Sequence, residues 1–294
     1  MRHLFLIIFC GFLYADSFIL DIGQTFKESY HKAKSYKQSD NKPKLVIIMD
    51  DIQNLAQYNA LRNIKLPITP SIFPKTAYTP DTPKIATYAK EYMIHLPLEA
   101  LNFYQKELEP LTTGISRDSL LAYMKNLKAD FPNLKYLNNH TGSKFTTSYN
   151  DMQNLISVFD ELDLRFIDSV TNTDIASPKI AREQGRLIMQ RDIFLDTIAQ
   201  KEHTDRQIDL AIKKAKDKGY AIAICHPFPS TIEALKNAKD KLTKEVDLIG
   251  PAQLNLISTP KTLPYIIAPN FTLHKITNAK TYIHTDTTLA SCTI

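Results

Sequence analysis

The chain has 294 residues, of which 44% are hydrophobic and 23% are charged, a composition typical of a folded globular protein rather than a disordered or fibrous one. Its seven glycines are too widely scattered to form a G-x-G-x-x-G turn or a GxxxxGK[ST] loop, which excludes nucleotide sites built on glycine-rich loops. The net charge of +5 is spread along the chain without an arginine- or lysine-rich block, so we expect no nucleic-acid partner.

The first fifteen residues predict export. Arg2 and His3 precede an apolar stretch, residues 4–15, that is shorter than the ~20 residues of a membrane-spanning helix. A basic start, a short apolar core and a small final residue are the parts of a secretory signal peptide. We therefore expect a signal peptide at 1–15, no stable transmembrane span and a periplasmic or secreted protein. An uncleaved membrane anchor is the alternative, because Leu13 is large for a position close to the cleavage site.

Residues 16–43 are polar and rich in lysine, and we expect a linker there. From residue 44 to 257, apolar runs alternate with segments of helical period. Strands are expected at 45–49, 68–73, 93–96, 136–137, 165–167 and 220–225. Helices are expected at 54–62, 83–92, 116–131, 150–162 and 205–218, the last ended by Gly219. This alternation predicts an α/β domain of parallel βαβ units with a barrel-like sheet, followed by a C-terminal extension at 258–294.

Polar residues with metal-binding or acid–base chemistry follow the predicted strands. They are Asp50, Asp51, His95, His140, Asp168 and His226. The carboxyl ends of parallel strands lie on one face of an α/β sheet, where they build the active site. Any one of the histidines could simply cap backbone groups, but the joint placement of carboxylates and imidazoles favours a functional site.

Asp50 and Asp51 are adjacent after a buried strand, and such close like charges repel unless a cation or hydrogen bonds offset them. Because adjacent strand residues point in opposite directions, we expect one to bind a metal and the other to address the reacting water. The alternative is that Asp51 caps the following helix and Asp50 is solvated. His95 and Glu99 add an imidazole and a carboxylate in one segment, and these ligand types suit Zn²⁺.

Six sequence blocks resemble those of a known family. They are VIIMDDI (46–52), HLPLEA (95–100), NNHTGSKFT (138–146), FIDSVTNTD (166–174), RDIFLD (191–196) and AICHPFPSTIEAL (223–235). In this order they resemble the divergent polysaccharide deacetylases, the YibQ-like branch of the carbohydrate esterase superfamily with a NodB-type fold. The resemblance covers residues 44–257 and implies a distorted (β/α) barrel of about seven parallel strands with a divalent metal at its carboxyl face.

The resemblance also implies roles for individual residues. Asp50 would be the general base, Asp51 a metal ligand and His226 the general acid. The typical second motif, H-x-x-x-H, reads here as His95-x-x-x-Glu99, so the second imidazole is missing from it. We assign Asp51, His95 and His140 as the ligands, with Glu99 as a substitute.

Further residues of these blocks are candidates for supporting roles. Asp168 and Asp192 are candidate catalytic residues that would orient the histidine or the base. Asn139, Ser143 and Arg191 are candidate substrate-binding residues. The alternative for Asp168, Asp192 and Arg191 is that they form internal salt bridges at the mouth of the barrel.

The sequence therefore predicts an exported, metal-dependent hydrolase that acts on acetyl groups of a cell-envelope polysaccharide or peptidoglycan, with Zn²⁺ as the favoured divalent metal. The alternative is a non-catalytic carbohydrate-binding or envelope-associated protein that retains the deacetylase fold. The H-x-x-x-E departure favours this alternative, whereas the presence of Asp50, Asp51 and His226 together favours the enzyme. Phosphoester hydrolysis has little support, because no basic cluster adjoins the site motifs.

Overall fold

The computed structural model describes residues 42–258. The predicted signal peptide, the predicted linker up to residue 41 and the extension from residue 259 lie outside this range and stay predictions. Within residues 42–258, no helix combines the length and the apolar character needed to cross a membrane.

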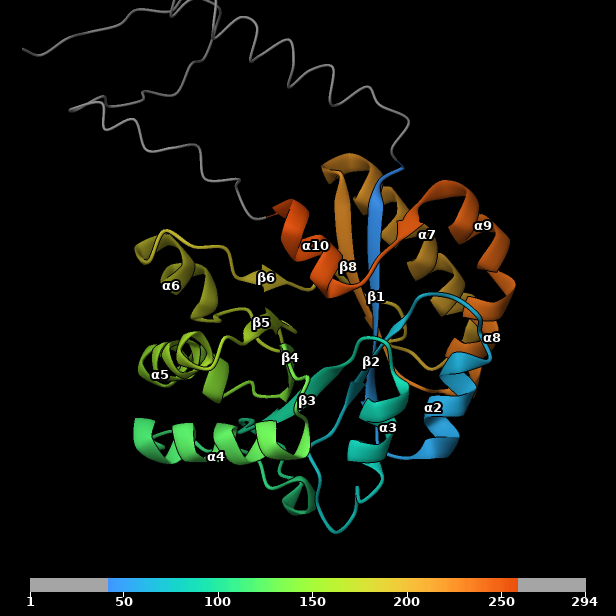
Figure 1. Cartoon of the computed structure of the whole chain (residues 1–294). Helices are drawn as coiled ribbons and strands as arrows, with labels where there is room; N and C mark the ends of the chain where they lie inside the picture. Colours follow the sequence, from blue (N-terminus) through green and yellow to red (C-terminus); the bar gives the residue numbers. More distant parts are fainter. Residues whose placement is uncertain (1–41, 259–294) are drawn as a thin grey trace, which may run out of the picture. The chain divides into compact units, whose positions relative to one another are not determined.

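One parallel sheet forms the centre of the described domain (Figure 1). Eight strands follow the order β6-β5-β4-β3-β2-β1-β8-β7, and β9 pairs with β1. The strands are β1 (Lys44–Ile52), β2 (Thr69–Ile72), β3 (Met93–Leu98), β4 (Tyr136–Thr141), β5 (Arg165–Asp168), β6 (Met189–Gln190), β7 (Ile193–Phe194), β8 (Tyr220–Cys225) and β9 (Asp247–Leu248).

The strand order shows how strongly this sheet curls. β6 and β7 stand at opposite ends of the order, yet only residues 191 and 192 separate them in the chain. Because consecutive Cα atoms are about 3.8 Å apart, the gap between Gln190 and Ile193 is at most about 11 Å. The two end strands therefore nearly meet, and the distorted (β/α) barrel predicted from the sequence is confirmed. It has nine strands among the described residues rather than about seven, because three of them are only two residues long and leave no apolar run to detect.

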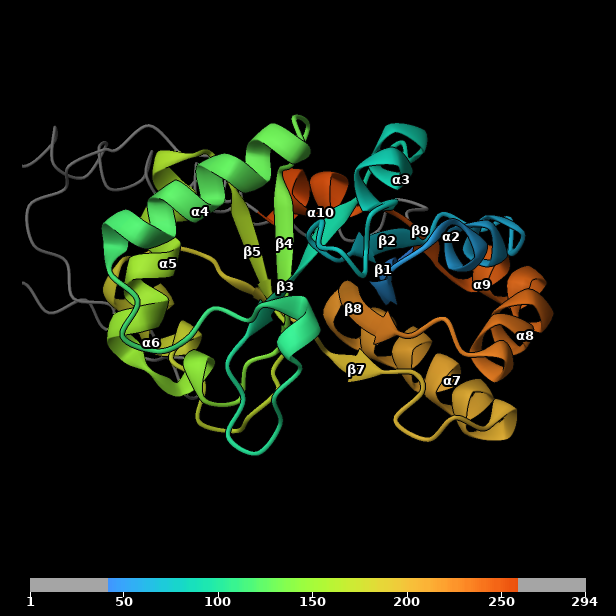
Figure 2. The same ribbon diagram turned by 90° about the horizontal axis from the view of Figure 1, so that it is seen from below.

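Most of the helices lie outside the curled sheet (Figure 2), but Leu254 of the last helix packs with the apolar residues inside it. The helices are α2 (Leu55–Arg62), α3 (Thr82–Tyr88), α4 (Arg117–Asp130), α5 (Tyr149–Glu161), α6 (Ser177–Glu183), α7 (Lys201–Lys218), α8 (Pro229–Asn237), α9 (Lys239–Glu245) and α10 (Pro251–Ser258), with short 3₁₀ turns at η1 (Lys106–Leu108) and η2 (Phe145–Thr147). As predicted, α7 ends at Gly219, which has a φ of 91°. The helix predicted to reach residue 92 ends at Tyr88, and Tyr92 packs instead against Phe131 with ring centroids 6.2 Å apart.

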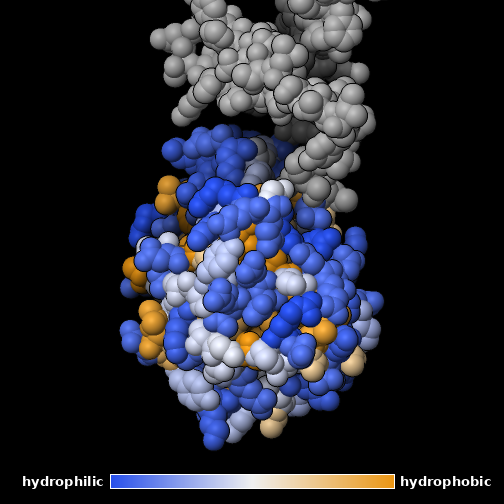
Figure 3. Space-filling model, turned by 90° about the vertical axis from the view of Figure 1, so that its left-hand side faces the viewer, coloured by the Kyte–Doolittle hydropathy of each residue, from blue (hydrophilic) through white to orange (hydrophobic). Residues whose placement is uncertain are grey.

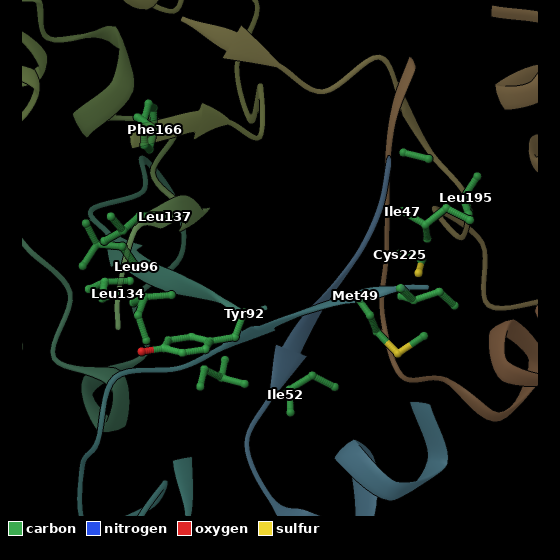
Figure 4. Close-up of a cluster of buried hydrophobic side chains, with 14 of the residues drawn as sticks. Ile47, Met49, Ile52, Tyr92, Leu96, Leu134, Leu137, Phe166, Leu195 and Cys225 are labelled. Carbon is green, nitrogen blue, oxygen red and sulfur yellow. The ribbon is translucent and has the colours of Figure 1, made fainter. Parts of the chain in front are cut away.

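Both faces of the sheet are buried in apolar layers. Successive strand residues point to opposite faces, so Val46 and Ile48 belong to the inner layer and Ile47 and Met49 to the outer layer. The outer layer packs the strands against the helices, and Figure 4 shows part of it, with Met49 beside Cys225. Burial on both faces explains why the strands read as continuous apolar runs.

Polar residues cover most of one face of the domain and also line one end of the barrel interior. The surface that carries α4, α5 and α6 is mostly hydrophilic, and its hydrophobic residues appear as small separate areas (Figure 3). The barrel interior changes from apolar to polar toward the strand ends: Ile48 is followed by buried Asp50 on β1, and Met93 by buried His95 on β3. The polar layer at the mouth of the barrel is thus the part of the domain equipped for chemistry.

Candidate metal centre

Three potential metal ligands from three strands meet at the mouth of the barrel: Asp51 of β1, His95 of β3 and His140 of β4. Asp51 Oδ1 lies 3.2 Å from His95 Nε2 and 3.1 Å from His140 Nδ1, and the two nitrogens lie 3.2 Å apart. A tetrahedral zinc ion with ligands at about 2.0–2.1 Å would separate those ligands by about 3.4 Å. The nearly equilateral triangle therefore has the size of one face of a zinc tetrahedron.

The hydrogen bonding of these atoms also fits a cation. Asp51 Oδ1 is buried and makes no hydrogen bond of acceptable geometry, although His95 Nε2 and His140 Nδ1 lie close to it. Buried polar atoms are nearly always hydrogen-bonded, so unpaired ones need an explanation. One carboxylate and two imidazoles are ligands that Zn²⁺ and related divalent ions accept. We conclude that the residues present fit a divalent metal.

Asp51 reaches this triangle through a break in β1. Its φ of 58° lies in the left-handed region, and the pairing of β1 with β2 shifts register between Met49 and Ile52. The prediction that Asp50 and Asp51 point in opposite directions is therefore wrong, because the bulge turns both carboxylates toward His95 Nε2, at 3.6 and 3.2 Å. The alternative role of Asp51 as a helix cap is also wrong, since Asn54 caps α2.

The two adjacent carboxylates have different electrostatic environments. Burial raises the pKa of Asp50, although the charge of His95 and a hydrogen bond from Asn138 oppose the increase. Burial acts in the same direction on Asp51, but the neighbouring imidazoles of His140 and His95 outweigh it and lower its pKa. Asp51 therefore stays ionised as a ligand should, and Asp50 becomes the stronger proton acceptor of the pair.

The two imidazoles also differ. Burial lowers the pKa of His140, which favours the neutral form that a metal requires. Burial likewise acts against protonation of His95, but the charge of Asp50 and the contact with Asp51 outweigh it and raise its pKa.

His226 directly follows β8, one residue beyond the paired residues Met49 and Cys225 and so beside Asp50. Its Nδ1 lies 2.9 Å from Asp196 Oδ1, and its backbone N–H donates to Asp196 Oδ2 at 2.6 Å. Burial disfavours the charged ring, but this hydrogen bond and the charge of Asp196 outweigh it and raise the pKa of His226 to about 9. The ring is thus protonated at neutral pH, as a general acid must be.

Asp196 and not Asp192 or Asp168 orients this histidine. Asp192 lies beside Ile222, four residues before His226, where it accepts hydrogen bonds from the Ile222 backbone N–H and from Lys218. Asp168 is fully buried and accepts from Ser177 Oγ at 2.6 Å and from the Val170 backbone N–H at 2.8 Å. Asp168 and Asp192, both predicted to be catalytic, therefore form hydrogen bonds that hold strands and loops in place.

Glu99 lies away from the candidate ligands. Its carboxylate accepts hydrogen bonds from Lys144 Nζ at 2.7 Å and from the backbone N–H and hydroxyl of Thr113 at 2.8 Å. These contacts, led by Lys144, lower its pKa to about 2. Residues four apart meet on a helix, but His95 lies in an extended strand, in which four residues span about 13 Å. The assignment of Glu99 as a substitute ligand is therefore not supported.

The three predicted substrate-binding residues hold the loops around the site. Asn139 is buried, accepts from the Ser169 backbone N–H and donates to the Thr141 carbonyl. Ser143 Oγ accepts from the Leu101 backbone N–H. Arg191 donates to the carbonyls of Ser169 and Val170 and lies 3.8 Å from the centroid of the Phe194 ring, which in turn stacks against His226. The side chains of all three residues thus already form hydrogen bonds within the protein.

Sequence reasoning missed two residues of this site, although each carried a signal. Asn138 lies two residues before His140 on the same strand, so both side chains point into the barrel. Asp196 follows β7 by two residues, so it lies near a strand end, as Asp168 does at the end of β5. Both residues lie within the sequence blocks that carry the resemblance, but only the folded structure shows that Asn138 contacts Asp50 and that Asp196 contacts His226.

The comparisons with known proteins agree with the fold. Residues 47–255 match the family model described as divergent polysaccharide deacetylase. An uncharacterized protein of Haemophilus influenzae is 30% identical over 241 residues, which cover 81% of this chain and 84% of that protein. The uncharacterized protein YibQ of Escherichia coli is 29% identical over 218 residues, which cover 72% and 67%. Among solved structures, an uncharacterized protein from Agrobacterium tumefaciens is similar with a TM-score of 0.63 at 16% identity, over 74% of this chain and 90% of that one.

Proposed function

The chain belongs to the family of divergent polysaccharide deacetylases, and we propose that it is an exported, zinc-dependent hydrolase that removes acetyl groups from a cell-envelope polysaccharide or peptidoglycan. The observation that carries the proposal is the ligand triangle of Asp51, His95 and His140 with Asp50 beside it. Residues 1–15 support export, because they have the parts of a signal peptide.

Each residue of the site has its own role in the proposed reaction. A divalent cation bound by the triangle would polarise the acetyl carbonyl and lower the pKa of a water molecule. Asp50 takes the proton of the attacking water, helped by the raised pKa that its burial gives it. His226 donates a proton to the departing amine or alcohol, so that the products are acetate and the free sugar group. Asp196 holds the His226 ring in place and keeps it protonated.

The geometry favours this hydrolase over a non-catalytic carbohydrate-binding protein. The sequence argument for the binding protein is that the H-x-x-x-E segment lacks a second imidazole. His140 offers that imidazole from the neighbouring strand, 3.2 Å from His95. The paired His226 and Asp196 would also have no use in a protein that only binds sugars.

Acetate release tests the proposal. Purified, zinc-loaded protein should release acetate from acetylated chito-oligosaccharides or peptidoglycan, and Asp50→Asn should abolish release while it keeps the metal. Glu99→Gln is the matched control, because this carboxylate bonds Lys144 and Thr113 rather than the ligands. If the wild type binds these glycans without releasing acetate, the binding protein is the better account.

A further inference from the structure

The side-chain amide of Asn138 connects the candidate base with a candidate metal ligand. It is fully buried on β4, directly opposite His95 in the register with β3. Asn138 Nδ2 lies 2.8 and 3.0 Å from the two carboxylate oxygens of Asp50 and 3.2 Å from Ser169 Oγ. Asn138 Oδ1 lies 2.6 Å from Ser71 Oγ and 3.1 Å from His95 Nδ1. The amide thus has four partners, which is the full number that two hydrogens and two lone pairs allow.

The partners fix the orientation of this amide. The carboxylate of Asp50 accepts hydrogen bonds, so the NH₂ group must face it. An amide turned the other way would place its oxygen against both oxygens of the buried carboxylate, at a large energetic cost. The amide oxygen therefore faces Ser71 and His95.

This orientation determines which nitrogen of His95 carries the proton. An amide oxygen can only accept, so His95 Nδ1 must donate to it. In the neutral ring the proton then sits on Nδ1, and the lone pair of Nε2 points toward Asp51 and His140. This is the tautomer that a metal bound at Nε2 requires.

We propose that Asn138 is a positioning residue, whose single amide fixes His95 in the Nδ1–H tautomer and holds the Asp50 carboxylate beside it. β4 and β1 are three strands apart, a distance of about 14 Å in a flat sheet, and the curled sheet lets one side chain bridge them. The same amide therefore positions both the candidate base, Asp50, and the candidate metal ligand, His95. The inference rests on the proposed function for the roles of Asp50 and His95, but the hydrogen-bond directions can be measured without substrate.

The test is the ¹⁵N NMR spectrum of the His95 ring in the metal-free full chain labelled with ¹⁵N-histidine. The spectrum is recorded above the pH at which the ring becomes neutral and is assigned with His95→Gln. The wild type should carry the proton on Nδ1. Asn138→Ala removes the acceptor, so the ring should shift toward the Nε2–H form, and zinc affinity measured by chelator competition should fall about 10- to 100-fold.

Two further variants separate positioning from general packing. Two carboxyl groups this close cannot both ionise, so Asn138→Asp keeps a proton facing Asp50 and an oxygen facing His95. It should therefore retain the Nδ1–H tautomer even if Asn138→Ala does not fold. Ser71→Ala removes another buried partner of the same amide oxygen without touching His95, and it should leave the tautomer and the zinc affinity close to wild type. An Nε2–H ring in the wild type or in Asn138→Asp would overturn the proposal, as would an unchanged tautomer in folded Asn138→Ala. Loss of acetate release alone would count against the proposed function and not against this inference.

Discussion

His140 Nδ1 lies 3.2 Å from His95 Nε2, although 45 residues separate the two histidines in the chain. A second imidazole placed four residues after the first would need a helical or folded segment, whereas His95 and His140 meet because their strands are neighbours in the sheet. The candidate metal centre is therefore assembled by strand pairing, and the roles of the residues around it can be tested one at a time.

The pH dependence of activity should report the protonation of His226. Its pKa is raised to about 9, so the general acid is present below this pH and is lost as the pH rises through it. We expect the alkaline limb of kcat/KM near pH 9 in the wild type. Asp196→Asn removes the charge that raises this pKa, so the limb should move down toward about 6.5, the ordinary value for histidine. An unchanged limb in Asp196→Asn would contradict the role of Asp196.

The dependence on the leaving group should also identify His226 as the acid. His226→Gln should slow release of acetate from an N-acetyl sugar by about 10²- to 10⁴-fold, the usual contribution of a general acid. Hydrolysis of p-nitrophenyl acetate should fall much less, because the nitrophenolate departs without a proton. Equal losses for both substrates would indicate that His226 acts by some other means.

Gly142 should be essential for the loop that follows His140. Its φ is 94°, and a Cβ at this position would lie 3.0 Å from Leu98 Cβ. Gly114 is the matched control, because its φ is 82° and no atom outside its immediate neighbours lies within 4 Å of such a Cβ. Gly114→Ala should cost about 1–2 kcal/mol of unfolding free energy from the backbone alone. Gly142→Ala should cost about 1–3 kcal/mol more, measured by urea unfolding, because the close contact adds to the strain. Equal costs would show that the loop accommodates the extra methyl group.

The sequence predicted those parts of the fold that leave a local pattern. The strands around Ile48 and Ile224 are buried on both faces and therefore appear as apolar runs, and α7 has a clear period and a glycine at its end. The two-residue strands β6, β7 and β9 have no such pattern, since their position depends on pairing with distant strands.

The candidate site could likewise be predicted from the sequence only in part. The strand-end positions of Asp51, His95 and His140 predicted that they share one face of the sheet, and the resemblance to the family implied their roles as ligands. The direction of Asp51 could not be predicted, since it depends on a bulge with a positive φ. Asp192 and Asp196 lie on the same short segment, and only the register with β8 shows that Asp196, and not the predicted Asp192, meets His226.

The metal content of the purified protein tests the ligand triangle most directly. We expect about one zinc ion per chain in the wild type and in Glu99→Gln, and loss of the metal in Asp51→Ala and in His140→Ala, each variant being checked for folding by circular dichroism. Zinc retained in both alanine variants, or lost in Glu99→Gln, would contradict the assignment of Asp51, His95 and His140 as the metal ligands.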